Sequence, residues 1–340
     1  SSMAGGLTEI YQEGLRIPVL RLQRAGELDR ELLDLMLLNM RLPAERRGDL
    51  NAQIAAARLS AKRLGEMVEA RGAGLLARAF EEIRARSGAR MRAAIADLPD
   101  GTWAFEDLLD GDGTGVEDIR IRLAVTCEGE RIRFDFSGTD PQVPGNVNLT
   151  LNAIQSAACY ALKALLDPDM PNNQGVIDAI EVVAPEGTLA NCRPPAAVAL
   201  RANTSQRVVD VILGALAPVI PERVVAAANG ANTSAVFAGT DYIYFETLGG
   251  GMGARFAKDG KDGVQVHITN TSNLPVEAIE MEYPLRVEAY ELIRDSGGAG
   301  RQRGGMGLRR VITPVDHTTE FSGVGERFRH PPWGLDGGWP

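Results

Sequence analysis

The sequence is poor in aromatic residues and in histidine. Aromatic side chains make up 5% of the 340 residues, and the three histidines, His267, His317 and His330, are dispersed. Few aromatics and 38 glycines favour tight turns and backbone-lined loops over stacked aromatic platforms. Three dispersed histidines argue against a complete metal site supplied by this chain alone.

Cysteine pairs and long apolar runs are missing as well. Cys127, Cys159 and Cys192 form no C-x-x-C motif, which predicts reduced thiols in a cytoplasmic protein. No apolar run approaches the roughly 18 residues of a membrane span, and the first residues show no signal-peptide pattern.

Positive charge does not cluster in this chain. The net charge is −9 and no block of Lys and Arg appears. Nonspecific nucleic-acid binding therefore lacks its electrostatic term, and we expect neither nucleic acid nor an acidic membrane as a partner. Hydrophobic residues at 44% and charged residues at 24% are typical of a soluble globular protein with one large domain or two.

Residues 1–98 carry a helical pattern. Apolar spacing predicts a helix over 27–41 that ends before Pro43, a second helix capped by Asp49, and a third over 74–97. The long helices meet at Gly72, which predicts an antiparallel hairpin that docks partners or serves as a scaffold.

Near Pro99 the hydrophobic period changes from 3.6 to 2. Residues 99–340 are therefore expected to form mixed, largely antiparallel sheets with helices over 150–166, 204–217 and 275–282 packed on them. The predicted fold class is α+β, with the helical hairpin preceding a substrate-site region.

Two stretches imitate ligand loops and fail their tests. The run from Asp110 to Gly115 resembles a calcium loop, but its twelfth position is Ile121 where a bidentate Glu is needed. The glycine run 249–253 lacks a following Lys-Ser/Thr and a clear βαβ unit, so it indicates neither a P-loop nor a dinucleotide site.

The stretch 264–286 offers the most promising site. His267 ends a strand-like run, five amide and hydroxyl residues follow over 269–273, and Glu277 and Glu280 share one face of the next helix. A polar substrate would be held in such a loop. The alternative is structural: acidic residues favour a helix start, and Asn and Ser supply caps and turns.

Two more polar turns precede predicted helices, one with Asn146 and Asn148 and one with Arg201 and Asn203. Helix starts present unpaired N–H groups to a ligand. We therefore expect the three turns to converge on half of a cavity that another polypeptide segment completes.

Seven segments, in order from about residue 7 to 340, resemble the hydantoinase B/oxoprolinase family. They are TEIYQEGLRIP, RGDLNAQIAA, FSGTDPQVPGNVN, PNNQGVIDAIEVVAPEGT, NTSQRVVDVILGALA, the run from DGVQVHITNTSNLPVEAIEMEYPLR to GGMGLRR, and HPPWGLDGG. The resemblance implies the B subunit of an ATP-dependent cyclic amidohydrolase. Such an enzyme opens a hydantoin, 5-oxoproline or a related lactam.

The resemblance also implies a hetero-oligomer. ATP with Mg²⁺ would be bound by a hydantoinase A-type ATPase subunit, with a small cyclic amide as substrate. The alternative within the family is a subunit of an ATP-dependent ketone carboxylase. An alternative from another functional class is a noncatalytic structural subunit, in which the helical hairpin docks partners.

In the family a divalent metal, manganese or zinc, is associated with an N-terminal region that is missing from these 340 residues. We assign no metal ligand here and expect this chain to be part of a longer B subunit, ending before the family's own C-terminus. The resemblance and the polar loops together identify His267 and Glu280 as candidate general bases. The candidate substrate-binding residues are Glu13, Arg16, Asn146, Asn148, Arg201, Asn203, Asn270 and Glu277.

Overall fold

The first hundred residues are mostly helical, and the last of their long helices joins the main core. The structure is a computed structural model that describes residues 5–340. Its first elements are η1 (Ile10–Gln12), β1 (Gln23–Arg24), β2 (Glu27–Leu28), α1 (Arg30–Leu38), α2 (Pro43–Arg71) and α3 (Ala73–Ala96). Helix α2 begins at Pro43, whose fixed φ suits the first turn, and the predicted start at Asp49 is wrong. Asp49 instead pairs with Arg46 inside the helix, at 2.7 Å.

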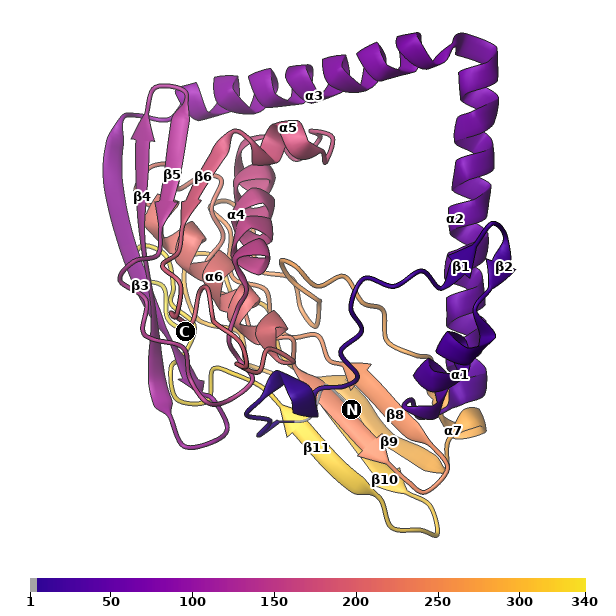
Figure 1. The fold of residues 1–340 in the computed structure, drawn as a ribbon. Helices are drawn as coiled ribbons and strands as arrows, with labels where there is room; N and C mark the ends of the chain where they lie inside the picture. The colour runs from indigo at the N-terminus through magenta and orange to yellow at the C-terminus, as the bar shows by residue number, and fades with distance from the viewer. Residues whose placement is uncertain (1–4) are drawn as a thin grey trace.

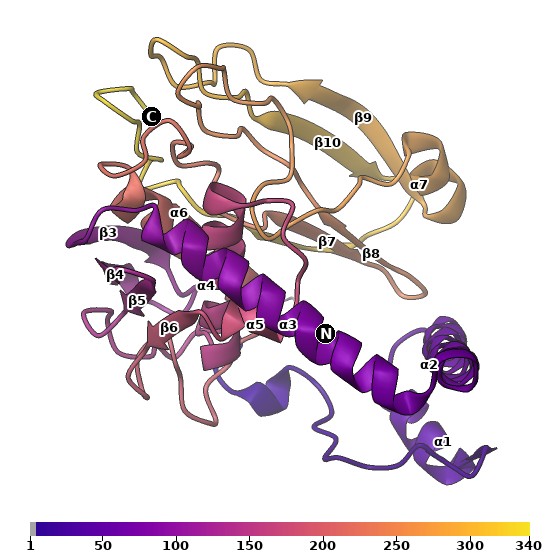
Figure 2. The same ribbon diagram turned by 90° about the horizontal axis from the view of Figure 1, so that it is seen from above.

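The two long helices are present, but they diverge at Gly72 instead of lying side by side (Figures 1 and 2). Gly72 has φ 81° and ψ 138°, a conformation that favours glycine. Helix α2 buries no residue, whereas α3 buries Met91 and Ile95 in the main core. The predicted antiparallel hairpin is therefore an angled arm, because the apolar face of α3 packs on the core and not on α2.

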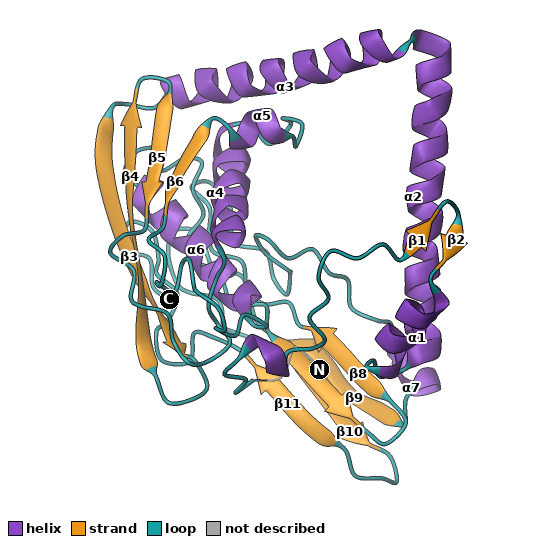
Figure 3. Cartoon of the chain, viewed as in Figure 1, coloured by secondary structure: helices purple, strands orange, loops and turns teal. Residues whose placement is uncertain are grey.

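The main core lies between a four-stranded sheet and three helices (Figure 3). The sheet has the order β3 (Gly101–Gly111), β4 (Glu117–Glu128), β5 (Arg131–Asp135), β6 (Ile180–Val183). The first three strands are antiparallel and β6 joins parallel to β5. Alternate residues of β4 from Ile119 to Cys127 are buried, as the period of two predicts.

Helices α4 (Leu151–Leu166), α5 (Gln174–Ile177) and α6 (Arg201–Leu216) complete this layer. Every residue of α6 from Asn203 to Leu216 is buried. At Gly214 a Cβ would lie 2.6 Å from the ring of Phe105 on β3, so the absence of a side chain lets helix and sheet approach closely. The polar residues of α6 must consequently find partners inside the protein.

A second, smaller core holds the C-terminal sheets. The order β11 (Glu320–Val324), β7 (Ser234–Ala238), β8 (Ile243–Thr247) is antiparallel, and β9 (Leu285–Leu292) pairs with β10 (Leu308–Pro314). Helix α7 (Val276–Glu282) lies against β9. The α+β class predicted from the sequence is confirmed. Within residues 5–340, no helix is both long and apolar enough to cross a membrane.

Candidate functional site

Three loops meet around the N-terminal half of α6. The backbone N–H of Leu200 donates to the carbonyl of Asn146 at 2.9 Å, and the hydroxyl of Thr204 donates to the carbonyl of Val147. Gln206 then donates through Nε2 to the carbonyl of Val266 at 3.0 Å and to Oγ1 of Thr269 at 2.6 Å. The polar turn before α4 and the 264–273 loop therefore meet at α6. The predicted turn with Arg201 and Asn203 is wrong, because α6 already begins at Arg201 and contains both residues.

Within this junction His267 contacts Asp210 of α6. The distance from Nε2 of His267 to Oδ1 of Asp210 is 3.0 Å, and the two side chains are 6% and 0% exposed. His267 has φ +51°, a left-handed conformation that is uncommon for residues other than glycine and clusters at functional sites. The loop therefore holds the imidazole in a defined orientation against a buried carboxylate.

A cavity of about 650 Å³ opens beside His267. One wall is apolar, with Tyr160 of α4 and the partly exposed Val225 and Val264, and another is the polar run 269–273. The ring of Tyr160 stands edge-on to the imidazole, with centroids 6.2 Å apart. A volume of this size suits a small organic molecule.

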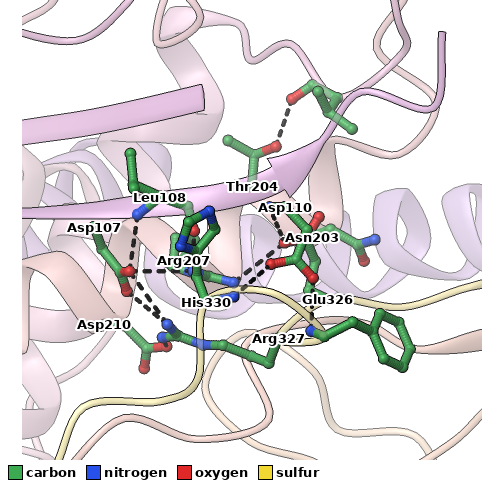
Figure 4. A network of polar contacts seen from close by, with 12 residues as sticks. Asp107, Leu108, Asp110, Asn203, Thr204, Arg207, Asp210, Glu326, Arg327 and His330 are labelled. Atoms are coloured by element: carbon green, nitrogen blue, oxygen red, sulfur yellow. Dashed lines mark hydrogen bonds and ion pairs between the residues drawn. The ribbon is translucent and has the colours of Figure 1, made fainter. Parts of the chain in front are cut away.

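Behind Asp210 lies a buried network of two guanidinium groups and three carboxylates (Figure 4). Arg327 reaches Oδ2 of Asp210 at 2.7 Å and Oδ2 of Asp107 at 2.9 Å. Arg207 reaches Asp107 and Glu326, each at 3.2 Å. Five ionisable side chains from β3, α6 and the loop after β11 therefore meet in a buried region. An unpaired charge there would lower the free energy of unfolding.

Burial and pairing shift the proton affinities in this network. Burial raises the pKa of Glu326 to about 7, against the lowering effects of the Asp110 N–H group and Arg207. At Asp210 burial also acts to raise the pKa, but His267, Arg327 and Arg207 outweigh it and hold the pKa below its ordinary value. Asp210 is consequently a carboxylate that can fix the imidazole tautomer by accepting a hydrogen bond from Nε2–H of His267.

Some of the predicted site residues hold loops together. Asn148 accepts from the N–H of Val143 and donates to three backbone carbonyls at 2.8–3.0 Å. Asn146 is fully buried in the same loop. The carboxylate of Glu13 accepts from the N–H groups of Val198 and Ala199, and Asn203 accepts from the N–H of Asn232 at 2.9 Å. These side chains build the loops around α6.

Other predicted residues lie on the surface. Arg16 stacks over the ring of Tyr11 at 5.1 Å, and Arg201 is exposed. Glu277 and Glu280 lie on α7, where Glu280 accepts from the N–H of Val287 at 2.9 Å. Of the ten predicted site residues, His267 and Asn270 line the cavity.

Sequence reasoning missed Asp210, Arg207 and Arg327. A signal for the first two was present, because Arg207 and Asp210 stand one turn apart in an otherwise apolar helix segment and would require internal partners once buried. No comparable pattern marked Arg327. It lies in the loop after β11, and tertiary folding alone brings it to Asp210.

The described residues hold no side-chain cluster suited to the metal that the resemblance implies. No group of three or more His, Cys, Asp or Glu side chains within residues 5–340 is placed to hold a metal ion. The glycines of the 249–253 run serve close backbone packing: a Cβ at Gly251 would lie 2.0 Å from the carbonyl of Gly305. A Cβ at Gly253 would lie 1.9 Å from that of Ala226. Close packing therefore accounts for the glycines at these two positions, while the run also lines a cavity together with Arg255 and Arg301.

Comparison with known proteins gives consistent matches. The family model for hydantoinase B/oxoprolinase matches residues 1–340. A putative D-/L-hydantoinase B subunit of Pseudomonas sp. (strain NS671) is 36% identical over 346 residues, which cover 97% of this chain and 58% of that protein. This chain therefore spans less than two thirds of that relative.

Two solved structures share the fold. The crystal structure of ATP-dependent caprolactamase from Pseudomonas jessenii has a TM-score of 0.83 and 28% identity, covering 92% of this chain and 56% of that one. A nucleotide-free acetone carboxylase structure has a TM-score of 0.87 over 100% of this chain and 48% of that one. At 20% identity, the second likeness concerns the fold alone.

Proposed function

Since this chain belongs to the hydantoinase B/oxoprolinase family, we propose that it is part of the B subunit of an ATP-dependent enzyme that opens a cyclic amide. A hydantoin, 5-oxoproline or a related lactam is the substrate class. The name of the relative, a putative hydantoinase B subunit, and the ATP-dependent caprolactamase of similar fold support this choice.

The observation that carries the proposal is the His267–Asp210 pair beside the cavity. Nε2 of His267 is engaged by Asp210 at 3.0 Å, so Nδ1 is the ring nitrogen that remains for a proton from a reacting group. A base oriented by a buried carboxylate is the arrangement that general base catalysis needs, and such catalysis contributes about 10²–10⁴-fold in rate.

In the proposed reaction a water oxygen bonds to the amide carbon while its proton passes to Nδ1 of His267. The C–N bond then breaks, and the proton moves from Nδ1 to the leaving ring nitrogen. Asn270 and the hydroxyls of the 269–273 run, which line the cavity, would hold the polar edge of the ring. ATP bound to the A-type subunit would supply the phosphoryl group that activates the otherwise unreactive amide oxygen. Cleavage of the C–N bond would then leave an acyl phosphate, which a second water would hydrolyse to the carboxylate and inorganic phosphate.

We place ATP on a hydantoinase A-type ATPase subunit, as the family resemblance implies. We place any manganese or zinc on polypeptide beyond residues 5–340, because no described cluster of side chains could hold it. The active form is then a hetero-oligomer. Cys127, Cys159 and Cys192 are all free thiols, which supports a reducing compartment, and we propose the cytoplasm.

The test is an assay of the complex with an A-type subunit. We expect one ATP consumed per ring opened, and we expect His267→Asn to lower kcat by about 10²-fold or more with the complex still assembled. Product formation that requires bicarbonate would instead identify a ketone carboxylase. Unchanged activity in the His267→Asn complex would favour a noncatalytic structural subunit.

A further inference from the structure

The cavity beside His267 carries two cationic side chains at its edge. Arg223 lies in the turn after α6 and Lys261 precedes the 264–273 loop; both line the cavity and both are exposed. Neither side chain forms an ion pair within residues 5–340. Their charges are therefore available to a ligand.

The cavity wall is positively charged, whereas the chain as a whole has a negative net charge. The sequence holds 45 Asp and Glu residues against 36 Lys and Arg, yet no described carboxylate lines this cavity. A concave surface with charges of one sign focuses the potential and raises the local concentration of ions of the other sign. The ligand that suits this wall is an anion.

The remaining wall restricts the ligand further. Tyr160, Val225 and Val264 present partly exposed apolar surface, and Asn270 and its neighbours present amides and hydroxyls. Such a wall suits a compact ring with one apolar face and one polar edge. A free inorganic anion would leave the apolar surface without a partner.

We propose that the cavity binds a cyclic amide that bears a carboxylate. Arg223 and Lys261 hold the carboxylate, and the ring amide lies toward His267 and Asn270. Guanidinium and ammonium groups both form charge-assisted hydrogen bonds with carboxylates. The inference rests on the proposed function and selects, among the substrates of that reaction, a lactam acid such as 5-oxoproline over a neutral lactam.

The experiment compares two lactams of the same ring size, 5-oxoproline and 2-pyrrolidinone, which differ in the carboxylate. In the complex with an A-type subunit, the unmodified chain should show a KM for 5-oxoproline at least tenfold below that for 2-pyrrolidinone. The double variant Arg223→Ala/Lys261→Ala should reduce the ratio of the KM for 2-pyrrolidinone to the KM for 5-oxoproline by about tenfold. Lys258→Ala removes an exposed lysine that does not line the cavity and should leave the ratio unchanged.

Two results would overturn the inference while leaving the proposed function intact: equal KM values for the two lactams, or equal losses for both lactams in the double variant. The second would mean that the cations bind something common to both reactions, such as a phosphoryl group. Failure to open any lactam would contradict the proposed function. Calorimetric titration with 5-oxoproline would then decide the inference, since binding weakened by the double variant supports it and undetectable binding refutes it.

Discussion

At Arg327 a single side chain bridges two buried carboxylates. The loop backbone at this residue is left-handed, with φ +73°. A Cβ on Gly230 would lie 2.5 Å from Nε of Arg327, so the glycine makes room for the guanidinium. Arg327 thereby connects Asp107 of β3 with Asp210 of α6 and indirectly orients His267. We regard it as a positioning residue.

Replacing Arg327 by Met should lower the free energy of unfolding by about 3–5 kcal/mol, because two buried carboxylates lose their shared partner. Denaturant titration measures this. Arg309→Met is the control: Arg309 pairs with Glu291 at 3.4 Å with both side chains more than half exposed, and such a pair contributes about 0–1 kcal/mol. Equal losses in the two variants would refute a special role for the buried arginine.

Glu326 predicts a pH dependence of stability. Its pKa rises from an ordinary value of 4.5 to about 7 on folding, so between these values the folded chain binds a proton that the unfolded chain has released. The stabilisation is complete below about pH 4.5 and is lost as the pH rises through about 7. One such group contributes a slope of at most about 1.4 kcal/mol per pH unit.

The variant Glu326→Gln should remove this slope, because its amide cannot ionise while Oε1 can still accept from the N–H of Asp110. Unfolding free energies of both chains between pH 5 and pH 8 measure the effect. Glu291→Gln, on the exposed strand β9, controls for the loss of one surface carboxylate. A slope that persists unchanged in Glu326→Gln would assign the proton uptake to another group.

At the scale of elements, α2 is a long helix that packs little against the rest of the chain. It buries no residue over Pro43–Arg71 and exposes Leu59, Leu64 and Met67 at 55%, 46% and 48%. Apolar side chains left in water along a long helix are typical of an interaction surface. We propose that the arm formed by α2 and the start of α3 docks the A-type subunit.

Leu64→Asp should weaken the affinity for the A-type subunit at least tenfold, because it places a charge in the proposed contact. Lys62→Gln is a matched control: it changes the net charge by the same amount, and two residues along a helix lie on nearly opposite faces. Biolayer interferometry gives the affinities, and circular dichroism verifies that both variants fold. Equal affinities would move the docking surface elsewhere.

At the scale of the whole molecule, α6 belongs both to the core and to the site. Its apolar residues fill the space against β3 and β4, while Gln206, Arg207 and Asp210 of the same helix contact the 264–273 loop and the loop after β11. The geometry of the cavity therefore depends on the folding of the entire main core. Separating stability from activity requires variants such as Arg223→Ala at the cavity edge.

The sequence by itself determined the α+β class, the existence of the long helices and of most strands, and the loop that carries His267 and Asn270. It did not determine the start of α2 at Pro43. The features that it determined follow from hydrophobic period, caps and turn residues, which act over a few neighbouring residues. The family segments are equally local. Together they pointed to His267 but not to Asp210, the carboxylate that it contacts.

Only the tertiary structure decided which polar residues face the cavity. Asn148, Glu13 and Asn203 looked like ligand-binding residues, but their side chains bind backbone groups of distant loops. Asp210 and Arg327, 117 residues apart, meet because α6 is buried. Local sequence patterns show which side chains are polar. Whether such a side chain contacts solvent, backbone or ligand depends on tertiary packing, which no short stretch of sequence encodes.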